Sequence, residues 1–154
     1  MRIARITLLV VACAGLAGCA SVPLAPSALD ARAKTFTPDA GRANVYVNRG
    51  GGLGTALLFQ TVLDGRIVGS LAPNTFQWLS VTPGEHSVTM TGAENSAQQK
   101  LTAEAGRNYY YDVSVHMGWV SGRVHIEALS EEAGRKAVLD SKLAETTSYT
   151  TSYP

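Results

Sequence analysis

Cysteine is scarce in this sequence of 154 residues: there are two, Cys13 and Cys19, and both lie close to the N-terminus. From residue 20 onward the chain has no thiol at all. A folded domain built from that part of the chain can have no disulfide bond and no thiolate metal site. Thiol catalysis and redox roles are excluded with them.

Charge is also low, since only 16% of the residues are charged while 45% are hydrophobic, as in an ordinary globular protein. The 13 basic side chains are balanced by 12 acidic ones, and two of the basic ones, Arg2 and Arg5, lie in a segment that we expect to be removed. No basic stripe is visible that would displace counterions from nucleic acid. We therefore expect no nucleic-acid partner.

The sequence has a short apolar run near its start but not one that would span a bilayer. Residues 6–17 form a run of roughly a dozen apolar residues, preceded by two arginines, which is typical of a secretory signal peptide. The run ends in the tetrapeptide LAGC, which resembles the bacterial lipobox. That resemblance implies a signal peptide over residues 1–18 and lipidation of Cys19, with palmitate among its acyl chains. An ordinary signal peptide and an uncleaved anchor are the alternatives.

Lipidation at Cys19 would give durable membrane attachment, because each buried CH₂ group of an acyl chain contributes about 0.8 kcal/mol. Ala20 follows the cysteine, where lipoproteins retained at the inner membrane usually have aspartate. The resemblance thus implies the periplasmic face of a Gram-negative outer membrane as the location.

Residues 19–41 are rich in proline, alanine and serine and are interpreted as the lipidated N-terminus and a tether. Ser27, with Asp30 three residues later, predicts a cap for a short helix over residues 28–34. An extended tether of this kind could hold the domain several nanometres from the lipid, at ~3.4 Å per residue. Whether it docks on the domain is left open, with weak docking favoured.

Residues 42–143 change to short alternating segments separated by turn signals. Asp64-Gly65 lies between apolar flanks and predicts a hairpin, because a type I′ turn needs positive φ at both centres. Pro83-Gly84 and Gly106 mark further turns. The pattern predicts a mainly β domain, an antiparallel β-sandwich-like fold.

A short C-terminal helix and a polar tail complete the prediction. Ser130 is positioned to cap a helix that begins at Glu131, and Gly134 within it suggests that the helix is short. The residues expected to face the sheet are Ala137, Val138 and Leu139. Residues 144–154 form a small polar repeat and are predicted to be disordered.

Several segments in this order are similar to one known family. They are ANVYVNR, VLDGRIVGSL, VTPGEHSVT, GAENSA, AEAGRNYYYDVSV and EEAGRKAVL. They resemble the bacterial domain-of-unknown-function family numbered 2846, whose members are largely small proteobacterial lipoproteins and secreted proteins. The likeness covers about residues 34–143. It implies a compact β-sandwich-like domain with no established activity, so no catalytic residue is carried over.

The glycines after the first expected strand raise the question of a nucleotide site. Gly50, Gly51, Gly52 and Gly54 follow a strand, as in many phosphate-binding loops. However, no Lys-Ser/Thr pair follows, the next residues favour a strand, and Thr55 stands where a Rossmann motif needs its third glycine. We predict a flexible connection between strands and no nucleotide or other cofactor.

The strongest polar cluster comes from a predicted hairpin between NYYYDVSVH and RVHIEAL. A register that pairs Val113 with Ile126 and Val115 with Val124 buries an apolar face, and a slip by one residue would not. The opposite face then holds the candidate ligand residues Asp112, His116, His125 and Glu127. A solvated sheet face is the simpler interpretation, and a small-ligand or metal-binding face is the alternative.

A catalytic triad can also be assembled on paper from Ser114, His125 and Asp112, but no nucleophile elbow or oxyanion turn accompanies it. We predict that the protein is not an enzyme.

The turn of this hairpin, MGWVSG, is the second candidate site. Met117, Trp119 and Val120 could form an exposed contact loop for an envelope protein or a membrane surface. Alternatively, the loop folds back over the end of the sandwich, which is the commoner arrangement. We therefore predict an outer-membrane-anchored, non-catalytic interaction or envelope-structural module that uses an open sheet edge or this loop.

Overall fold

The structure, a computed structural model, describes residues 20–147. The predicted signal peptide and Cys19 lie outside these residues, as do residues 148–154 of the predicted tail. The elements in chain order are α1 (Ser27–Ala33), β1 (Ala43–Arg49), β2 (Phe59–Leu63), β3 (Arg66–Leu71), β4 (Thr75–Val81), β5 (Gly84–Thr91), β6 (Ser96–Ala103), β7 (Asn108–Met117), β8 (Gly122–Ala128), α2 (Glu131–Leu139) and β9 (Lys142–Leu143).

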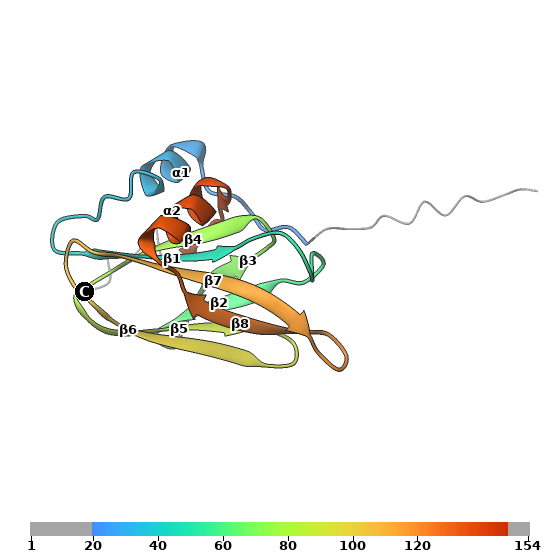
Figure 1. Cartoon of the computed structure of the whole chain (residues 1–154). Coiled ribbons are helices and arrows are strands. Elements are labelled where there is room, and N and C mark those ends of the chain that lie inside the picture. The colour runs from blue at the N-terminus through green and yellow to red at the C-terminus, as the bar shows by residue number, and fades with distance from the viewer. Residues whose placement is uncertain (1–19, 148–154) are drawn as a thin grey trace, which may run out of the picture.

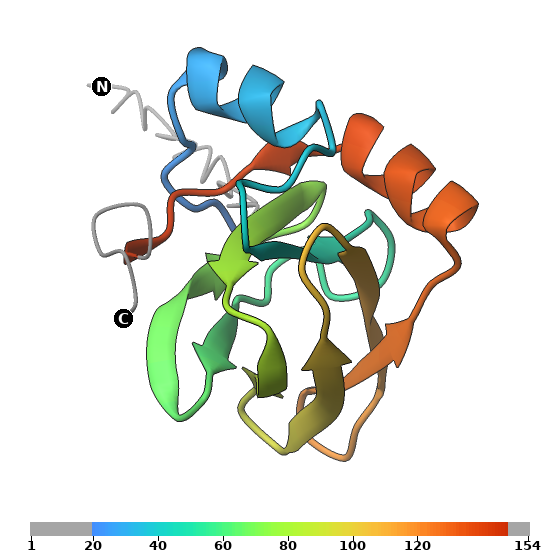
Figure 2. The same cartoon turned by 90° about the vertical axis from the view of Figure 1, so that its left-hand side faces the viewer.

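The strands form two sheets that face each other, which confirms the predicted mainly β, sandwich-like fold. One sheet has five strands in the order β8-β7-β1-β4-β9, and the other has four in the order β3-β2-β5-β6. Both helices cover the outer face of the five-stranded sheet (Figures 1 and 2). No helix among residues 20–147 is long and apolar enough to cross a membrane.

Two strand pairings are parallel, whereas the sequence suggested antiparallel pairing throughout. β1 pairs with β7 in parallel, and β4 pairs with the two-residue β9 in parallel. A parallel neighbour needs a long connection. Between β1 and β7 that connection contains the whole four-stranded sheet and β4, a long-range arrangement that local alternation of residue types does not encode.

Alternation along β1 explains how the chain makes two hydrophobic clusters. Val45 and Val47 are fully buried between the sheets, while Tyr46 is turned to the outer face and is also buried. The helices cover that outer face and enclose Tyr46, Phe76 and Tyr110. Each large side chain buried in this way contributes about 1.5–3 kcal/mol. Tyr46 thus points away from the core between the sheets and is still buried.

The predicted turns and hairpin register are confirmed. Asp64 and Gly65 have φ values of 49° and 79°, as a type I′ turn requires. In the β7–β8 hairpin, Val113 pairs with Ile126 and Val115 pairs with Val124.

Both helices form, with two corrections to their predicted details. Pro26 occupies the N-cap position of α1 without any side-chain cap hydrogen bond, so Ser27 is not the cap. Ser130 does cap α2, accepting a hydrogen bond from the Ala133 N–H at 3.3 Å. Val138 is fully buried, but Leu139 is 56% exposed and does not face the sheet.

Gly134 allows α2 to lie unusually close to the sheet. A Cβ atom at this position would stand 2.2 Å from Cγ of Tyr110, which is far inside van der Waals contact. The glycine therefore permits close packing of the helix on the sheet. This packing outweighs the lower helix propensity of glycine.

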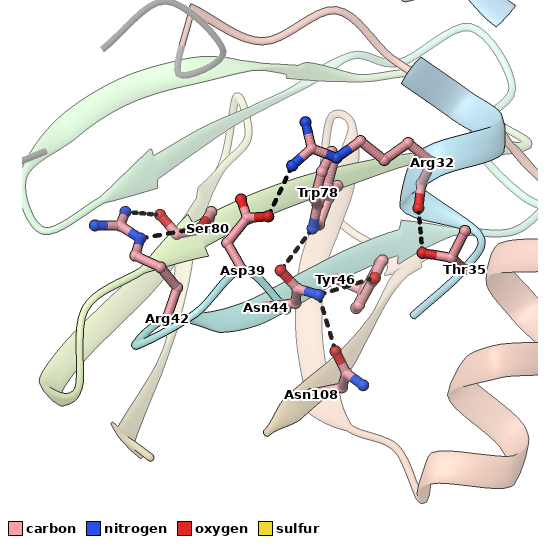
Figure 3. A network of polar contacts seen from close by, with 9 residues as sticks. All are labelled: Arg32, Thr35, Asp39, Arg42, Asn44, Tyr46, Trp78, Ser80 and Asn108. Atoms are coloured by element: carbon pink, nitrogen blue, oxygen red, sulfur yellow. Dashed lines mark hydrogen bonds and ion pairs between the residues drawn. The ribbon is translucent and has the colours of Figure 1, made fainter. Parts of the chain in front are cut away.

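The segment interpreted as a tether docks on the domain through a buried polar network, and Figure 3 shows the centre of this network around Asn44. The Tyr46 hydroxyl donates to the carbonyl of Ala33 at 2.8 Å, and the Asn108 amide donates to the carbonyl of Phe36 at 2.8 Å. Asn44 joins these groups. It accepts a hydrogen bond from the Trp78 indole at 2.8 Å and donates to Asn108 at 3.0 Å.

The start of this segment is also hydrogen bonded to the residues that follow β9. Leu24 forms a bridge with Ala144, and the Glu145 N–H donates to the carbonyl of Pro23 at 2.8 Å. Ala144 is fully buried and Thr146 is 5% exposed, so residues 144–147 belong to the domain rather than to the predicted disordered tail.

Candidate functional site

The three apolar side chains at the turn of the β7–β8 hairpin lie in the open. Met117, Trp119 and Val120 are 86%, 96% and 95% exposed, and we call these three residues the apolar tip. The expectation that this loop folds back over the end of the sandwich is wrong. The hairpin instead projects beyond the rest of the sheet (Figure 1).

A single carboxylate from the other sheet holds the loop in this shape. Glu94, in the turn between β5 and β6, accepts hydrogen bonds from the backbone N–H groups of Trp119 at 3.1 Å and Val120 at 2.8 Å. It also accepts a hydrogen bond from the N–H of Ser121. The bonds from Ser121 and then Val120 lower the pKa of Glu94 below its usual range.

These hydrogen bonds from the loop to Glu94 leave no room for a side chain at position 118. A Cβ atom on Gly118 would stand 2.4 Å from Oε2 of Glu94 and 2.1 Å from the carbonyl oxygen of Ser121. The loop thus turns its backbone N–H groups inward to Glu94 and its apolar side chains outward. Backbone groups that would otherwise demand water are satisfied within the protein.

The residues beside Glu94 fasten the base of the hairpin. The Asn95 side chain exchanges two hydrogen bonds with the backbone of Val124, both at 2.8 Å. The Gln99 side chain donates to the carbonyl of Ile126 at 3.0 Å. These contacts occupy the outer edge of β8, so this edge is not open for a partner strand, as the predicted edge pairing would require.

The glycine-rich segment lies next to the apolar tip, and we call residues 50–57 the glycine loop. Arg49, which is 2% exposed, holds it from inside by donating to the carbonyls of Leu57 at 2.5 Å and Gly54 at 2.6 Å. The guanidinium lies 4.6 Å from the ring centre of Phe59, and burial lowers its pKa. The only cation of this loop region is thus turned inward and is not offered to a phosphate.

The glycine loop and the hairpin contact each other through small residues. A Cβ atom on Gly122 would lie 2.7 Å from Leu57, and one on Gly54 would lie 3.1 Å from Val115. Beside this contact Leu53 is 70% exposed and lines a shallow groove together with Met117 and Trp119. The apolar surface therefore extends from the tip onto the glycine loop.

The second candidate site is the polar face of the same hairpin, and its predicted pairs are present. Asp112 pairs with Glu127, and His116 pairs with Arg123. The rings of His116 and His125 are 5.5 Å apart, edge to face. Within residues 20–147, however, no three histidine or acidic side chains gather closely enough to hold a metal ion.

The hypothetical triad is not assembled. Ser114 lies directly opposite His125 in the hairpin, but the hydrogen bond of its hydroxyl is with Nε2 of His116, at 3.4 Å. Asp112 accepts a hydrogen bond from Asn48 at 3.1 Å, which directs its carboxylate toward β1. The arrangement therefore lacks a nucleophile activated by an oriented base.

Comparison with known proteins confirms the family resemblance but adds no activity. Residues 39–125 match a family described as "Protein of unknown function (DUF2846)". A protein of Haemophilus influenzae described as "Uncharacterized protein" is 31% identical over 124 residues, which cover 80% of this chain and 74% of that protein. No solved structure matches.

Proposed function

Since the chain belongs to the DUF2846 family, whose function is unknown, we propose its role from its sequence and geometry. The protein is a lipid-anchored, non-catalytic module of the cell envelope, held at the periplasmic face of the outer membrane. It presents the apolar tip, on a rigid hairpin, as its contact surface.

The observation that carries this proposal is the exposure of Met117, Trp119 and Val120 on a loop that is clasped by Glu94. Leaving three apolar side chains in water forgoes about 1.5–3 kcal/mol for each one that could be buried. A loop that only connected two strands would gain nothing from this arrangement. Exposed apolar groups held in a fixed shape are typical of contact sites, and tryptophan is prominent among the residues that dominate them.

Anchoring is supported by the arginines, the short apolar run and the LAGC tetrapeptide at the N-terminus. A non-catalytic role is supported by the contact of the Ser114 hydroxyl with His116 and by the engagement of Asp112 with Asn48. The inward orientation of Arg49 supports the expectation that the glycine loop binds no nucleotide.

Two experiments on the full chain test the two halves of this proposal. The Cys19→Ser variant is expected to lose palmitate labelling and to leave the membrane fraction, and continued labelling would contradict the anchor.

A photo-crosslinking amino acid at position 119 is expected to give adducts in cells, to lipid or to protein. The matched control is position 67, where Ile67 is 59% exposed on β3. Equal yields at both positions would contradict the assignment of the tip as the contact surface.

A further inference from the structure

We propose that the occupant of the apolar tip is the bilayer that holds the anchor: the tip lies in the surface of that membrane and fixes the orientation of the domain on it. This inference rests on the proposed lipidation of Cys19. It goes further because a lipid anchor alone would leave the domain free to turn.

The first observation is the contact made by Ala20, the residue that follows Cys19 in the sequence. The Ala20 N–H donates to the carbonyl of Thr55, in the glycine loop, at 3.0 Å. Cys19 directly precedes Ala20 in the sequence. Because the chain is docked from Ala20 onward, no long tether separates the lipid from the domain.

The second observation is that Ala20 and the apolar tip share one end of the molecule. The glycine loop contacts Ala20 on one side and the β7–β8 hairpin, through Leu57, on the other. In Figure 1 the blue start of the described chain, the loop after β1 and the hairpin turn all lie at the right-hand side. Acyl chains on Cys19 would therefore enter the membrane beside Leu53 and Trp119.

The third observation is the absence of charge from the segments that meet there. Residues 20–24, 50–59 and 117–122 contain no acidic or basic residue. The nearby carboxylate of Glu94 is directed to backbone N–H groups of the loop. Transfer of a charged side chain out of water is the most costly part of membrane contact. These segments carry no charged side chain, so placing them in the headgroup region avoids that cost.

The other end of the sheets has the opposite character. Glu85 is six residues from Thr91 along β5, on the order of 20 Å away from the turn that holds Glu94. Exposed charged side chains gather around that distant end, namely Asp64, Arg66, Glu85, Glu104 and Arg107. The apolar tip and the glycine loop thus carry no charged side chain, whereas charged side chains gather at the distant end. On the anchor side, the exposed Asp140 and Lys142 line a groove with Ala20.

The composition of the tip favours a bilayer over a protein groove. Tryptophan is enriched at membrane–water interfaces, because its amphipathic ring fits the headgroup level. Arg123, exposed at the base of the hairpin opposite His116, supplies a positive charge next to the tip that would attract a phosphate headgroup. The anchor also keeps the tip at a high effective concentration near the membrane, so weak insertion suffices.

The test uses the intrinsic fluorescence of the full lipidated chain, purified from membranes and reconstituted into phosphatidylethanolamine–phosphatidylglycerol vesicles. Trp119 is 96% exposed and Trp78 is 6% exposed, so the Trp119→Phe variant isolates the signal of the tip. We expect the Trp119 emission to shift to the blue in vesicles. Lipids brominated on the acyl chains are expected to quench it, and acrylamide quenching is expected to fall severalfold relative to detergent-free Cys19→Ser protein.

The control is Ile67→Ser, which changes an exposed apolar residue on another strand and is expected to leave the quenching unchanged. Flotation of the vesicles separates the two ways in which the account can fail. Protein that floats with vesicles but shows no bromolipid quenching of Trp119 would overturn the bilayer contact while leaving the anchor intact, and would favour a protein partner. Protein that does not float would overturn the anchor and this inference with it.

Discussion

Removal of one hydroxyl group, in the Tyr46→Phe variant, is expected to loosen the N-terminal segment without disturbing the sandwich core. The Tyr46 hydroxyl donates to the carbonyl of Ala33 at 2.8 Å. Ala33 is 0% exposed, so its carbonyl group would be left without this donor in a buried position. The aromatic ring, which stacks on Tyr110 at 5.1 Å, is retained in phenylalanine.

The magnitude follows mainly from the loss of the buried hydrogen bond to Ala33; the hydroxyl also accepts a longer one, at 3.3 Å, from the Asn44 amide, which keeps its bond to Asn108. A buried polar group that loses its partner costs about 1–3 kcal/mol, and each 1.4 kcal/mol changes an equilibrium about tenfold. We therefore expect the open population of the segment to rise about 5- to 150-fold. Opening of the segment is a local event, so the change should exceed any change in the global unfolding midpoint.

Limited trypsin digestion of the full chain in detergent measures this opening, because Arg32 and Lys34 lie within and just after α1. When opening and closing are fast relative to cleavage, the cleavage rate follows the open population. The matched control is Tyr109→Phe. Its hydroxyl donates to the carbonyl of Thr102 at 3.1 Å, in an exposed position that does not touch the segment.

Cleavage rates that agree within a factor of about two between Tyr46→Phe and Tyr109→Phe would refute the reasoning, since even the low end of the expected penalty exceeds that factor. Faster cleavage in Tyr46→Phe alone would support the specific docking that keeps Ala20 beside the glycine loop. A released segment of residues 20–41 could extend to about 70 Å, which would uncouple the tip from the anchor.

Three further predictions concern the tip, the buried tyrosines and the polar face. Glu94→Ala is expected to speed hydrogen exchange of the hairpin-loop amides. In the wild-type protein the pKa of Glu94 is lowered, so the protection of these amides should hold above pH of about 4.3. It should be lost as the pH falls through the folded-state pKa of Glu94. Burial raises the pKa values of Tyr46 and Tyr110, so the urea midpoint should be constant below pH of about 10 and fall as pH rises through the folded-state values; a flat profile there would contradict their burial. Changing both His116 and His125 to alanine is expected to leave metal content and ligand-induced spectral shifts unchanged, whereas loss of a bound metal would revive the ligand-face alternative.

The sequence was informative where the structure depends on local patterns. Alternation of Val113 and Val115 against Val124 and Ile126 predicted the hairpin register, because only one register buries all four. Asp64-Gly65 predicted its turn from backbone geometry alone. Both are short-range features, and both are confirmed.

Long-range contacts of polar residues could not be predicted in the same way. Glu94 lies 25 residues before Trp119, and a lone glutamate in a turn normally indicates a solvated surface. Arg49 ends β1 just before the glycine loop, and it is buried against carbonyls of that loop. Nothing local in the sequence distinguishes these two side chains from ordinary surface charges.

The exposure of Trp119 was misjudged for a related reason. Apolar loops commonly fold over the end of a sandwich, and the sequence contains no sign that Glu94 and Asn95 hold this one outward. Similarly, the proline-rich start of the chain resembled a loose tether, and its docking depends on Asn44 and Asn108, which lie on separate strands.

The most direct measurement of the central claim uses the absence of thiols after residue 20. The Val120→Cys variant introduces a single exposed thiol into the tip and keeps Trp119. The control, Ile67→Cys, introduces one on β3. The replaced side chains are 95% and 59% exposed. Labelling of the reconstituted lipoprotein by a membrane-impermeant maleimide is then compared with labelling of the Cys19→Ser form in solution. Strong protection at position 120 in vesicles, with none at position 67, is the predicted result. Equal labelling at position 120 in vesicles and in solution would show that the tip does not lie in the membrane.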